Sequence, residues 1–434
     1  MLGDGCSIGW ENISKIGNIK TIMDQQMKNR VYYGQYSLKY WIELMLSKNI
    51  ICPPYQRRFV WRQNDVENFI KNIKDEDLFI PPITIGVVKT SDNHGNIAQK
   101  HNYIIDGQQR LTSLLLTYYR VLPKPVKDFR EENSIETEDE RKDEDKDVIN
   151  KWQFEQLLDL SNDINKIREE AIKSGKYNEF EIEGIDDKFF SNHFIGFSYI
   201  VPDPDIEDEQ TKYFSRLFNT LNAQGTPLTP RESRYALYFM NSKLEKWFNP
   251  EACKNIIIYP NATKGTSIDF VRYISIITDY VRRYRKNDVL KGYDSRGGAD
   301  GKLKTYEEYY RKYIYSVVDK SDDDIFGNFS QTFGDQYEEL LNTLSNTITQ
   351  MDIVNKRKFE SIVDSDFYFF GLVYYVIFKR KNIDASRSQQ LTNLLNKKID
   401  KYRREFKGKN VSTVENIRTR IKQSIAIYSR YTMA

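Results

Sequence analysis

Five consecutive residues, Asp106-Gly-Gln-Gln-Arg110, have the residue types and spacing most able to do chemistry in this sequence. They follow the apolar run Tyr103-Ile-Ile and precede a helical pattern, so a strand is expected to pass directly into a helix. The first turn of such a helix offers free backbone N–H groups, and Gly107 lets a ligand approach them closely. Together with the helix dipole and the guanidinium of Arg110, this junction could bind phosphate.

The carboxylate of Asp106 would repel a phosphate group unless it holds a metal ion, orients a water molecule or contacts a ribose hydroxyl. A purely structural interpretation stands beside this one. In that interpretation Asp106 only caps the helix, and Arg110 pairs with an acidic side chain.

A second segment, Pro54-Tyr-Gln-Arg-Arg-Phe-Val-Trp61, combines two guanidinium groups, an amide and three aromatic rings. Burying so many polar groups without a ligand would be costly. Gln56 and Arg57 could contact phosphate or base, whereas the aromatic rings more often pack in a core.

A third segment, from Phe214 to Thr229, reads as a helix that Gly225 ends and Pro227 stops. Asn219 and Asn222 lie near its end. Their amides could read the edge of a nucleobase or a ribose.

These three segments, in this order and separation, resemble the N-terminal domain family of GmrSD-type restriction proteins, which belongs to the ParB/sulfiredoxin-like superfamily. The similar residues are Asp106-Gly107-Gln108-Gln109-Arg110, then Gln56-Arg57 followed by Phe59 and Trp61, then Phe218-Asn219-x-x-Asn222-x-x-Gly225. The resemblance covers about Tyr36 to Phe239. It implies a nucleotide-binding site with NTP hydrolysis, a role in defence against foreign or modified DNA, and coupling to a separate HNH-type nuclease domain.

On this basis we expect an NTP-binding and NTP-hydrolysing sensor or regulatory subunit. Asp106 would orient a metal ion or water, and Arg110 and Arg57 would clamp phosphates, with Asp106 and Arg110 as the catalytic pair. The expected nucleotide contacts are Gln56, Arg57, Gly107, Gln108, Gln109, Asn219 and Asn222. Mg²⁺ is the expected ion, bound by Asp106, because phosphate oxygens plus one carboxylate suit it.

Two other functions remain open from the sequence. The first is a non-catalytic DNA-binding adaptor that recruits a separate nuclease subunit, and the second is a direct ParB-like nuclease. HNH chemistry is excluded within this sequence, because it has three histidines (His94, His101 and His193) and none follows Phe194. The three cysteines are too widely spaced for a zinc ribbon or a disulfide framework.

An α+β fold is expected, with a ParB/sulfiredoxin-like core of short strands and helices followed by an all-helical domain. The expected divisions are an N-terminal extension at 1–35, the nucleotide-binding domain at 36–242 with a charged insertion at 123–150, and the helical domain at 243–434. Strands are expected at 83–88, 103–105 and 194–201. Helices are expected at 37–48, 66–73, 111–118, 152–171, 210–221, 268–284, 306–317, 337–351, 367–380 and 391–406. Asn64 or Asp65 is the expected cap of the second helix.

The net charge of +3 hides a segregation along the chain. Ten acidic and three basic residues lie between Glu131 and Asp147, whereas Gly371 to Ala434 holds fifteen Lys and Arg against four Asp and Glu. The acidic segment is expected to be a solvated insertion. The basic segment could hold DNA phosphates, and its candidate residues are Lys397, Lys398, Arg403 and Arg404.

The longest apolar run, Phe367 to Phe378, is far shorter than the roughly 20 residues that a bilayer helix needs. No membrane association is expected, and the start of the sequence does not read as a secretory signal. We therefore expect a cytoplasmic protein. The sequence leaves its oligomeric state open, a homo-oligomer included.

Overall fold

The computed structural model describes residues 30–433 except for 54, 76–78, 92–96, 125–151, 203–206, 223–229, 262–263, 294–298, 354–357 and 407–409. The acidic segment Glu131–Asp147 therefore lies outside the described residues, as do Gly225 and Pro227. A strand already begins at Arg30, inside the region expected to be an N-terminal extension.

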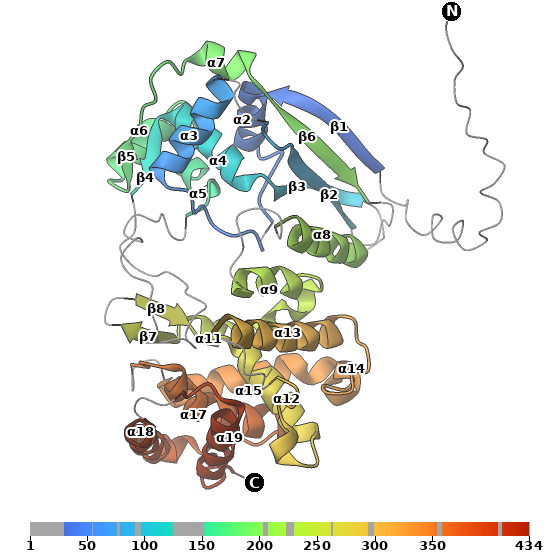
Figure 1. The fold of residues 1–434 in the computed structure, drawn as a ribbon, viewed down its shortest axis with the longest axis vertical. Helices are drawn as coiled ribbons and strands as arrows, with labels where there is room; N and C mark the ends of the chain where they lie inside the picture. Colours follow the sequence, from blue (N-terminus) through green and yellow to red (C-terminus); the bar gives the residue numbers. More distant parts are fainter. Residues whose placement is uncertain are drawn as a thin grey trace, which may run out of the picture.

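A four-stranded sheet forms the centre of the N-terminal part (Figure 1). Its strands, in spatial order, are β1 (Arg30–Ser37), β6 (Phe194–Val201), β2 (Ile83–Ser91) and β3 (Ile97–Asp106). β2 and β3 form an antiparallel hairpin, and β6 runs parallel to β2. The register pairs Thr84 with Asp106 and Ile85 with Ile104, which leaves Ile105 as a β-bulge. Because a bulge redirects the neighbouring side chains, it determines the direction in which the side chain of Asp106 points.

One face of the sheet is covered by three helices, α2 (Leu38–Leu46), α3 (Gln63–Lys74) and α4 (Gln108–Tyr119). Each buries an apolar stripe against the sheet, as the sequence spacing predicts. In α2, for example, Trp41 and Ile42 are buried, and the Ser37 hydroxyl accepts a hydrogen bond from the backbone N–H of Tyr40 at 3.2 Å. The expected cap of α3 is corrected, because Arg62 is its N-cap and Asp65 accepts from the Arg62 N–H at 2.8 Å.

The opposite face of the sheet packs against α8 (Glu207–Asn222). Phe214 and Phe218 of this helix are buried against Ile105 and Ile200 in a small apolar cluster. The junction that ends β3 therefore lies at the end of a strand that is covered on both faces.

The prediction of a single helix at 152–171 is wrong. The structure has two short helices there, α5 (Glu155–Leu158) and α6 (Ile167–Lys173). Turn chemistry separates them, because the Ser161 hydroxyl accepts from the Asp163 N–H and the Asp163 carboxylate accepts from the Asn165 N–H. Three small elements complete this part, namely β4 (Val121–Pro123), β5 (Tyr177–Glu179) and α7 (Asp187–Asn192).

In the residues that the structure describes, the C-terminal half is helical, as expected, apart from one two-stranded hairpin. Its helices are α9 (Pro230–Tyr238), η2 (Ser242–Leu244), α10 (Glu245–Phe248), α11 (Glu251–Lys254), α12 (Phe270–Arg282), η3 (Lys286–Asp288), α13 (Ala299–Val318), α14 (Phe329–Thr332), η4 (Gly334–Gln336), α15 (Tyr337–Gln350), α17 (Ile362–Val373), η5 (Tyr374–Phe378), η6 (Ala385–Arg387), α18 (Ser388–Glu405) and α19 (Val414–Tyr428). The hairpin is β7 (Ile257–Asn261) with β8 (Lys264–Ser267).

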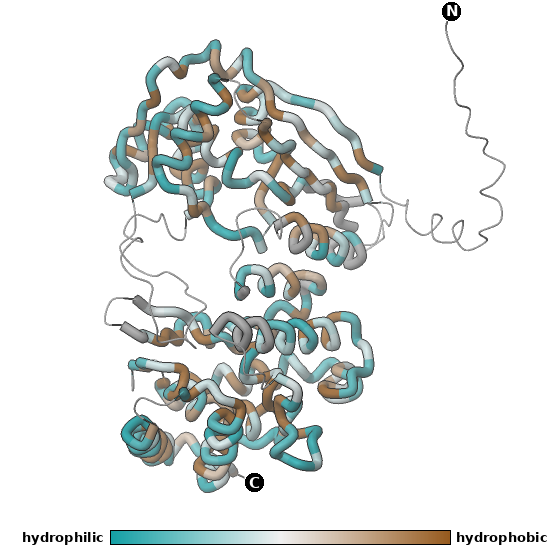
Figure 2. Tube along the Cα trace, viewed as in Figure 1, coloured by the Kyte–Doolittle hydropathy of each residue, from teal (hydrophilic) through white to brown (hydrophobic). Residues whose placement is uncertain are grey.

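This half has its own apolar core, with α17 at its centre. All residues of α17 are buried, and Figure 2 shows hydrophobic segments gathered toward the inside of both parts of the molecule. α8 and α9 lie between the sheet and the remaining helices (Figure 1). Among the described residues, no helix combines the length and apolar character needed to cross a bilayer.

Candidate functional site: the junction of β3 and α4

The junction of β3 and α4 has the geometry that the sequence predicts. β3 ends at Asp106, Gly107 adopts a φ of 97°, and α4 begins at Gln108. A Cβ atom on Gly107 would lie 2.4 Å from Cδ1 of Ile83, so both the backbone angle and the space require glycine. No side chain in the described part of the protein caps α4. The N–H groups of its first turn are thus left to a ligand or to water, at the positive end of the helix dipole.

Asp106 and Arg110 form an ion pair across one helical turn. Nη2 of Arg110 lies 2.7 Å from Oδ2 of Asp106, and its Nη1 donates to the carbonyl oxygen of Pro81. The Arg110 side chain is 12% exposed and that of Asp106 is 37% exposed. Burial lowers the pKa of Arg110, while the charge of Asp106 opposes that shift. Arg110 therefore fixes the carboxylate, which keeps a solvent-facing side. Asp106 does not cap the helix, but Arg110 does pair with an acid, as the structural interpretation held.

Gln56 and Gln109 hold the loop at 55–61 against this junction. Nε2 of Gln56 donates to the carbonyl oxygens of Ile104 and Ile105, at 2.8 and 3.0 Å. Gln109 accepts from the N–H of Val60 at 2.9 Å and donates to the carbonyl oxygen of Arg58 at 3.0 Å. Both amides are engaged with the backbone. The structure gives both amides a positioning role, and their direct contact with a nucleotide stays a prediction.

Arg57 is the cation that this loop presents to the junction. It is half-buried and makes no hydrogen bond to the described part of the chain. Burial lowers its pKa, and the nearby carboxylates of Glu232 and Asp106 oppose that shift. Glu232 belongs to α9, so a helix far from the junction in the sequence lies near Arg57 in the fold. The sequence reasoning missed Glu232, because no motif marks it and only the path of the chain brings it near Arg57.

Gln108, the first residue of α4, is 3% exposed, and neither its Oε1 nor its Nε2 has a hydrogen-bond partner among the described residues. The hydroxyl of Thr112, one turn later, is also buried and without a partner there. Each such group costs about 1–3 kcal/mol when it is left unsatisfied. The junction thus holds a buried amide that could both donate to and accept from a bound molecule.

The remaining expected site residues lie on α8 and α18. Asn219 and Asn222 are at the C-terminal end of α8, and the structure describes their backbone but not their side chains. On α18, Arg403 pairs with Glu360 at 2.6 Å and with the buried Asp364 at 2.5 Å. Its charge is thereby neutralised. Lys397 and Arg404 are exposed on the same helix, and Lys398 is half-exposed.

No group of three or more His, Cys, Asp or Glu side chains that could hold a metal ion occurs in the described residues. Asp106 is the carboxylate at the junction itself. A single carboxylate suits Mg²⁺ when phosphate oxygens supply the other ligands. The residues present therefore fit a magnesium ion that arrives with a nucleotide.

The fold and the junction together define the structural class of this protein. It has an α+β domain with an Asp-Gly-Gln-Gln-Arg strand-to-helix turn, joined to a helical region. Residues 42–239, which are less than half of the chain, match the model of the family described as "GmrSD restriction endonuclease, N-terminal domain". The resemblance placed at Tyr36 to Phe239 is therefore confirmed.

One curated relative is the "Uncharacterized protein MJ0686" of Methanocaldococcus jannaschii, which is 26% identical over 269 residues. The alignment covers 52% of this chain and 45% of the relative, so the chain spans less than half of the relative's length. No solved structure matches the chain.

Proposed function

We propose that this protein binds and hydrolyses a nucleoside triphosphate and acts as a sensor or regulatory subunit in restriction of foreign or modified DNA. The observation that carries the proposal is the buried, unpartnered amide of Gln108 at the uncapped start of α4. The family description, which names a restriction endonuclease, supports the broader role.

The phosphates would bind at the N-terminus of α4, beside Arg57. Free N–H groups and an arginine fork are the usual partners of phosphate oxygens. Arg57 suits this role because it has no hydrogen bond to the described residues and is held close to the junction. Gln108 would contact the base, the ribose or the nearest phosphate.

In the hydrolysis step, a water oxygen attacks the γ-phosphorus and the bond to the β,γ-bridging oxygen breaks, which yields a nucleoside diphosphate, inorganic phosphate and a proton that passes to solvent. Asp106 would orient that water or a Mg²⁺ ion, which would neutralise phosphate charge when bound. Arg110 holds Asp106 at 2.7 Å and thus acts mainly as a positioning residue, with its phosphate contact secondary.

A second function, a DNA-binding adaptor that recruits a separate nuclease without turning over nucleotide, is favoured by the exposed arginines Arg282 and Arg285 at the end of α12. The two differ in a direct measurement. The sensor releases phosphate from NTP, whereas the adaptor does not.

The test is a thermal-shift titration with ATP, GTP, CTP and UTP, each with and without Mg²⁺, on wild type and Gln108→Leu. Saturation at 100 times Kd stabilises a protein by about 2.7 kcal/mol. Leu at position 108 removes an unsatisfied amide, so the ligand-free melting temperature should stay or rise while the nucleotide-induced shift falls. Gln350→Leu, at an exposed position on α15, is the matched control. A wild-type protein that no nucleotide stabilises would refute the proposal.

A further inference from the structure

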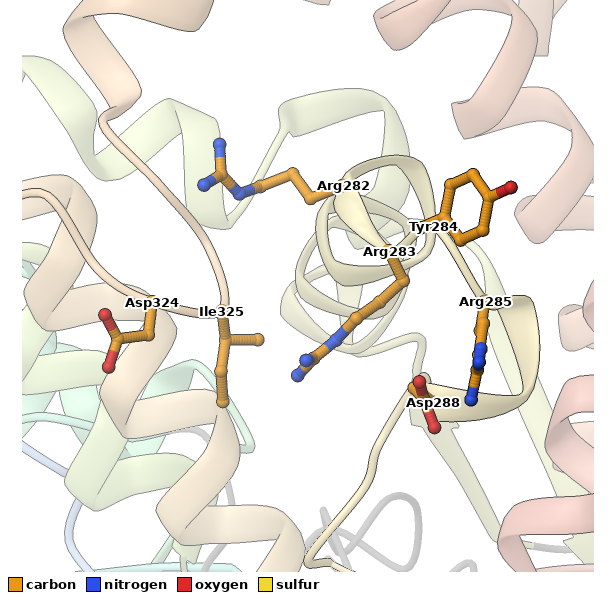
Figure 3. Close-up of a pocket in the computed structure, with 7 residues that line it drawn as sticks. All are labelled: Arg282, Arg283, Tyr284, Arg285, Asp288, Asp324 and Ile325. Atoms are coloured by element: carbon orange, nitrogen blue, oxygen red, sulfur yellow. The ribbon is translucent and has the colours of Figure 1, made fainter.

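The end of α12 carries a basic turn that has no part in the nucleotide site. Arg282, Arg283 and Arg285 line a cavity of about 440 Å³ together with Tyr284, Asp288 and Asp324 (Figure 3). This turn lies outside residues 42–239, so the family match does not cover it.

Two of the three arginine side chains have no polar partner among the described residues. Arg283 pairs with Asp279 at 2.7 Å, but Arg282 and Arg285 are exposed, and their side chains make no ion pair or hydrogen bond with the described residues. Tyr284, between them, is 99% exposed. Of the two acids in the cavity, Asp288 lies 3.6 Å from the ammonium of Lys291. Asp324 is exposed across the cavity from the arginines and is its main repulsive charge toward an anion.

Two lysines extend the basic turn, namely Lys286, which directly follows Arg285, and Lys379 at the end of η5. Lys286 Nζ lies 4.7 Å from the ring centre of Tyr280, whose ring is 6.0 Å from that of Tyr374. Lys379 sits over the Tyr374 ring at 5.4 Å. Burial and, next, the charge of Lys379 lower the pKa of Lys286. The charges of Lys286 and Lys379 therefore repel each other, and the carboxylate of Asp279 offsets part of this repulsion.

α19 extends the same surface. Lys422 donates to the Asn287 side chain at 2.9 Å, and Arg418 donates to the carbonyl oxygen of Val289 at 2.8 Å. The basic residues that these contacts bring together are Arg282, Arg283, Arg285, Lys286, Lys291, Lys379, Arg418 and Lys422, and Arg380 and Lys381 follow Lys379 directly in the sequence. The dipole of α12 accounts for basic side chains in its own last turn, but not for those of η5 and α19.

We propose that this basic surface, defined by those ten residues, binds the phosphate backbone of double-stranded DNA. Duplex DNA carries one negative charge per about 1.7 Å of its axis, which suits cations contributed by α12, η3, α19 and the end of η5. Arginine forks contact phosphate oxygens in a bidentate way, and the exposed ring of Tyr284 can pack on a sugar. Because these are backbone contacts, binding should depend little on base sequence.

The test is a salt titration of binding to a 30-base-pair duplex of arbitrary sequence, without nucleotide, using Arg282→Gln/Arg285→Gln/Lys379→Gln. These side chains are exposed, so the variant should fold as wild type does. We expect its slope of log affinity against log salt to flatten by about 0.9 for each phosphate that the variant no longer neutralises. Tyr284→Ala should weaken binding without changing the slope, since the ring is uncharged.

The matched control is Lys397→Gln/Lys398→Gln/Arg404→Gln, which removes the same charge from α18. It should retain more affinity and a steeper slope than the triple variant of the basic surface. The proposal is overturned if the basic-surface variant and wild type give parallel titrations, if the α18 control shows the greater decrease in affinity, or if single-stranded DNA of the same length binds more tightly than the duplex. The measurement needs no NTP, so its result can be interpreted even if the protein does not bind nucleotide.

Discussion

Asp106 and Arg110 illustrate how two interpretations of one motif can both hold in part. The ion pair at 2.7 Å is a structural contact, yet it leaves one side of the carboxylate toward solvent beside an uncapped helix. A pair made only for stability would gain little from this half-exposed position. The arrangement is better explained if Arg110 aims Asp106 at a ligand.

We expect Asp106→Ala to abolish NTP hydrolysis while leaving some nucleotide affinity, and Arg110→Ala to weaken both. A positioned acid–base group contributes about 10²–10⁴-fold to rate, so the decrease in the first variant should be of that order. Phosphate release and equilibrium binding measured on the same preparations check this. Turnover of Asp106→Ala at the wild-type rate would remove the catalytic assignment.

Gly107 offers a second test at this scale, because its φ of 97° and its contact with Ile83 both exclude a side chain. Gly107→Ala should lower the free energy of unfolding by about 1–3 kcal/mol and displace the start of α4. Gly175→Ala is the matched control, since its φ is 69° but nothing lies within 4 Å of the added Cβ. Urea titrations of both variants separate backbone strain from the close approach, and equal decreases in stability would mean that Ile83 imposes no constraint.

The elements around the site were predictable where local chemistry determines them. The strand-to-helix junction, the hairpin and α2 follow from apolar spacing, Gly107 and the Ser37 cap. The division of the expected helix at 152–171 was not foreseen, because Asp163 and its neighbours form side-chain turns that the apolar period masks.

The site itself was predictable in its residues but not in their roles. Gln56, Gln109 and Arg57 were all expected to contact nucleotide, and only the folded chain shows that the two amides bind backbone while the guanidinium does not. Glu232 could not be found at all, since its proximity to Arg57 depends on the return of α9. Which amide side chains hydrogen-bond to the backbone depends on the tertiary structure.

The loop at 55–61 should therefore depend on Gln109. In Gln109→Leu, the N–H of Val60 and the carbonyl of Arg58 are left without their partner, which costs about 1–3 kcal/mol for each unsatisfied group. We expect reduced stability together with weaker nucleotide binding, because Arg57 is carried on the loosened loop. Equilibrium unfolding and thermal shift measure the two effects. Reduced stability with unchanged nucleotide affinity would show that Arg57 does not need this anchor.

At the scale of the whole molecule, α9 connects the site to the helical half. It carries Glu232 near Arg57 and, two residues later, Arg234, whose side chain is 2% exposed. Arg234 pairs with Asp269 and with Glu307, each at 2.6 Å. Beyond them, the buried Asp366 pairs with Arg272 at 3.0 Å and with Arg420 at 2.8 Å. Removing one partner from such a buried pair usually costs about 3–5 kcal/mol.

This network predicts a pH dependence of stability that can be assigned to Asp269. Burial raises the pKa of that carboxyl, but the charges of Arg234 and Arg231 outweigh it, and the pKa is held below its usual value of 3.8. A group whose pKa is depressed by folding contributes stability above its unfolded pKa and loses it as pH falls through the folded value. The contribution of Asp269 should thus be complete above about pH 5 and decline below pH 4.

Asp269→Asn should accordingly be less stable than wild type at pH 6, and the difference in free energy of unfolding should shrink as pH falls below 4. Urea titrations from pH 3 to pH 7 give this difference directly. Asp159→Asn is the control, because Asp159 forms only an exposed pair with Lys48 at 3.3 Å, and such pairs contribute little. A difference for Asp269→Asn that stays constant across this range would mean that its charge does not stabilise the contact between α9 and α12. In that case the link from the junction to the helical half would rest on its other contacts, among them the pair of Arg234 with Glu307.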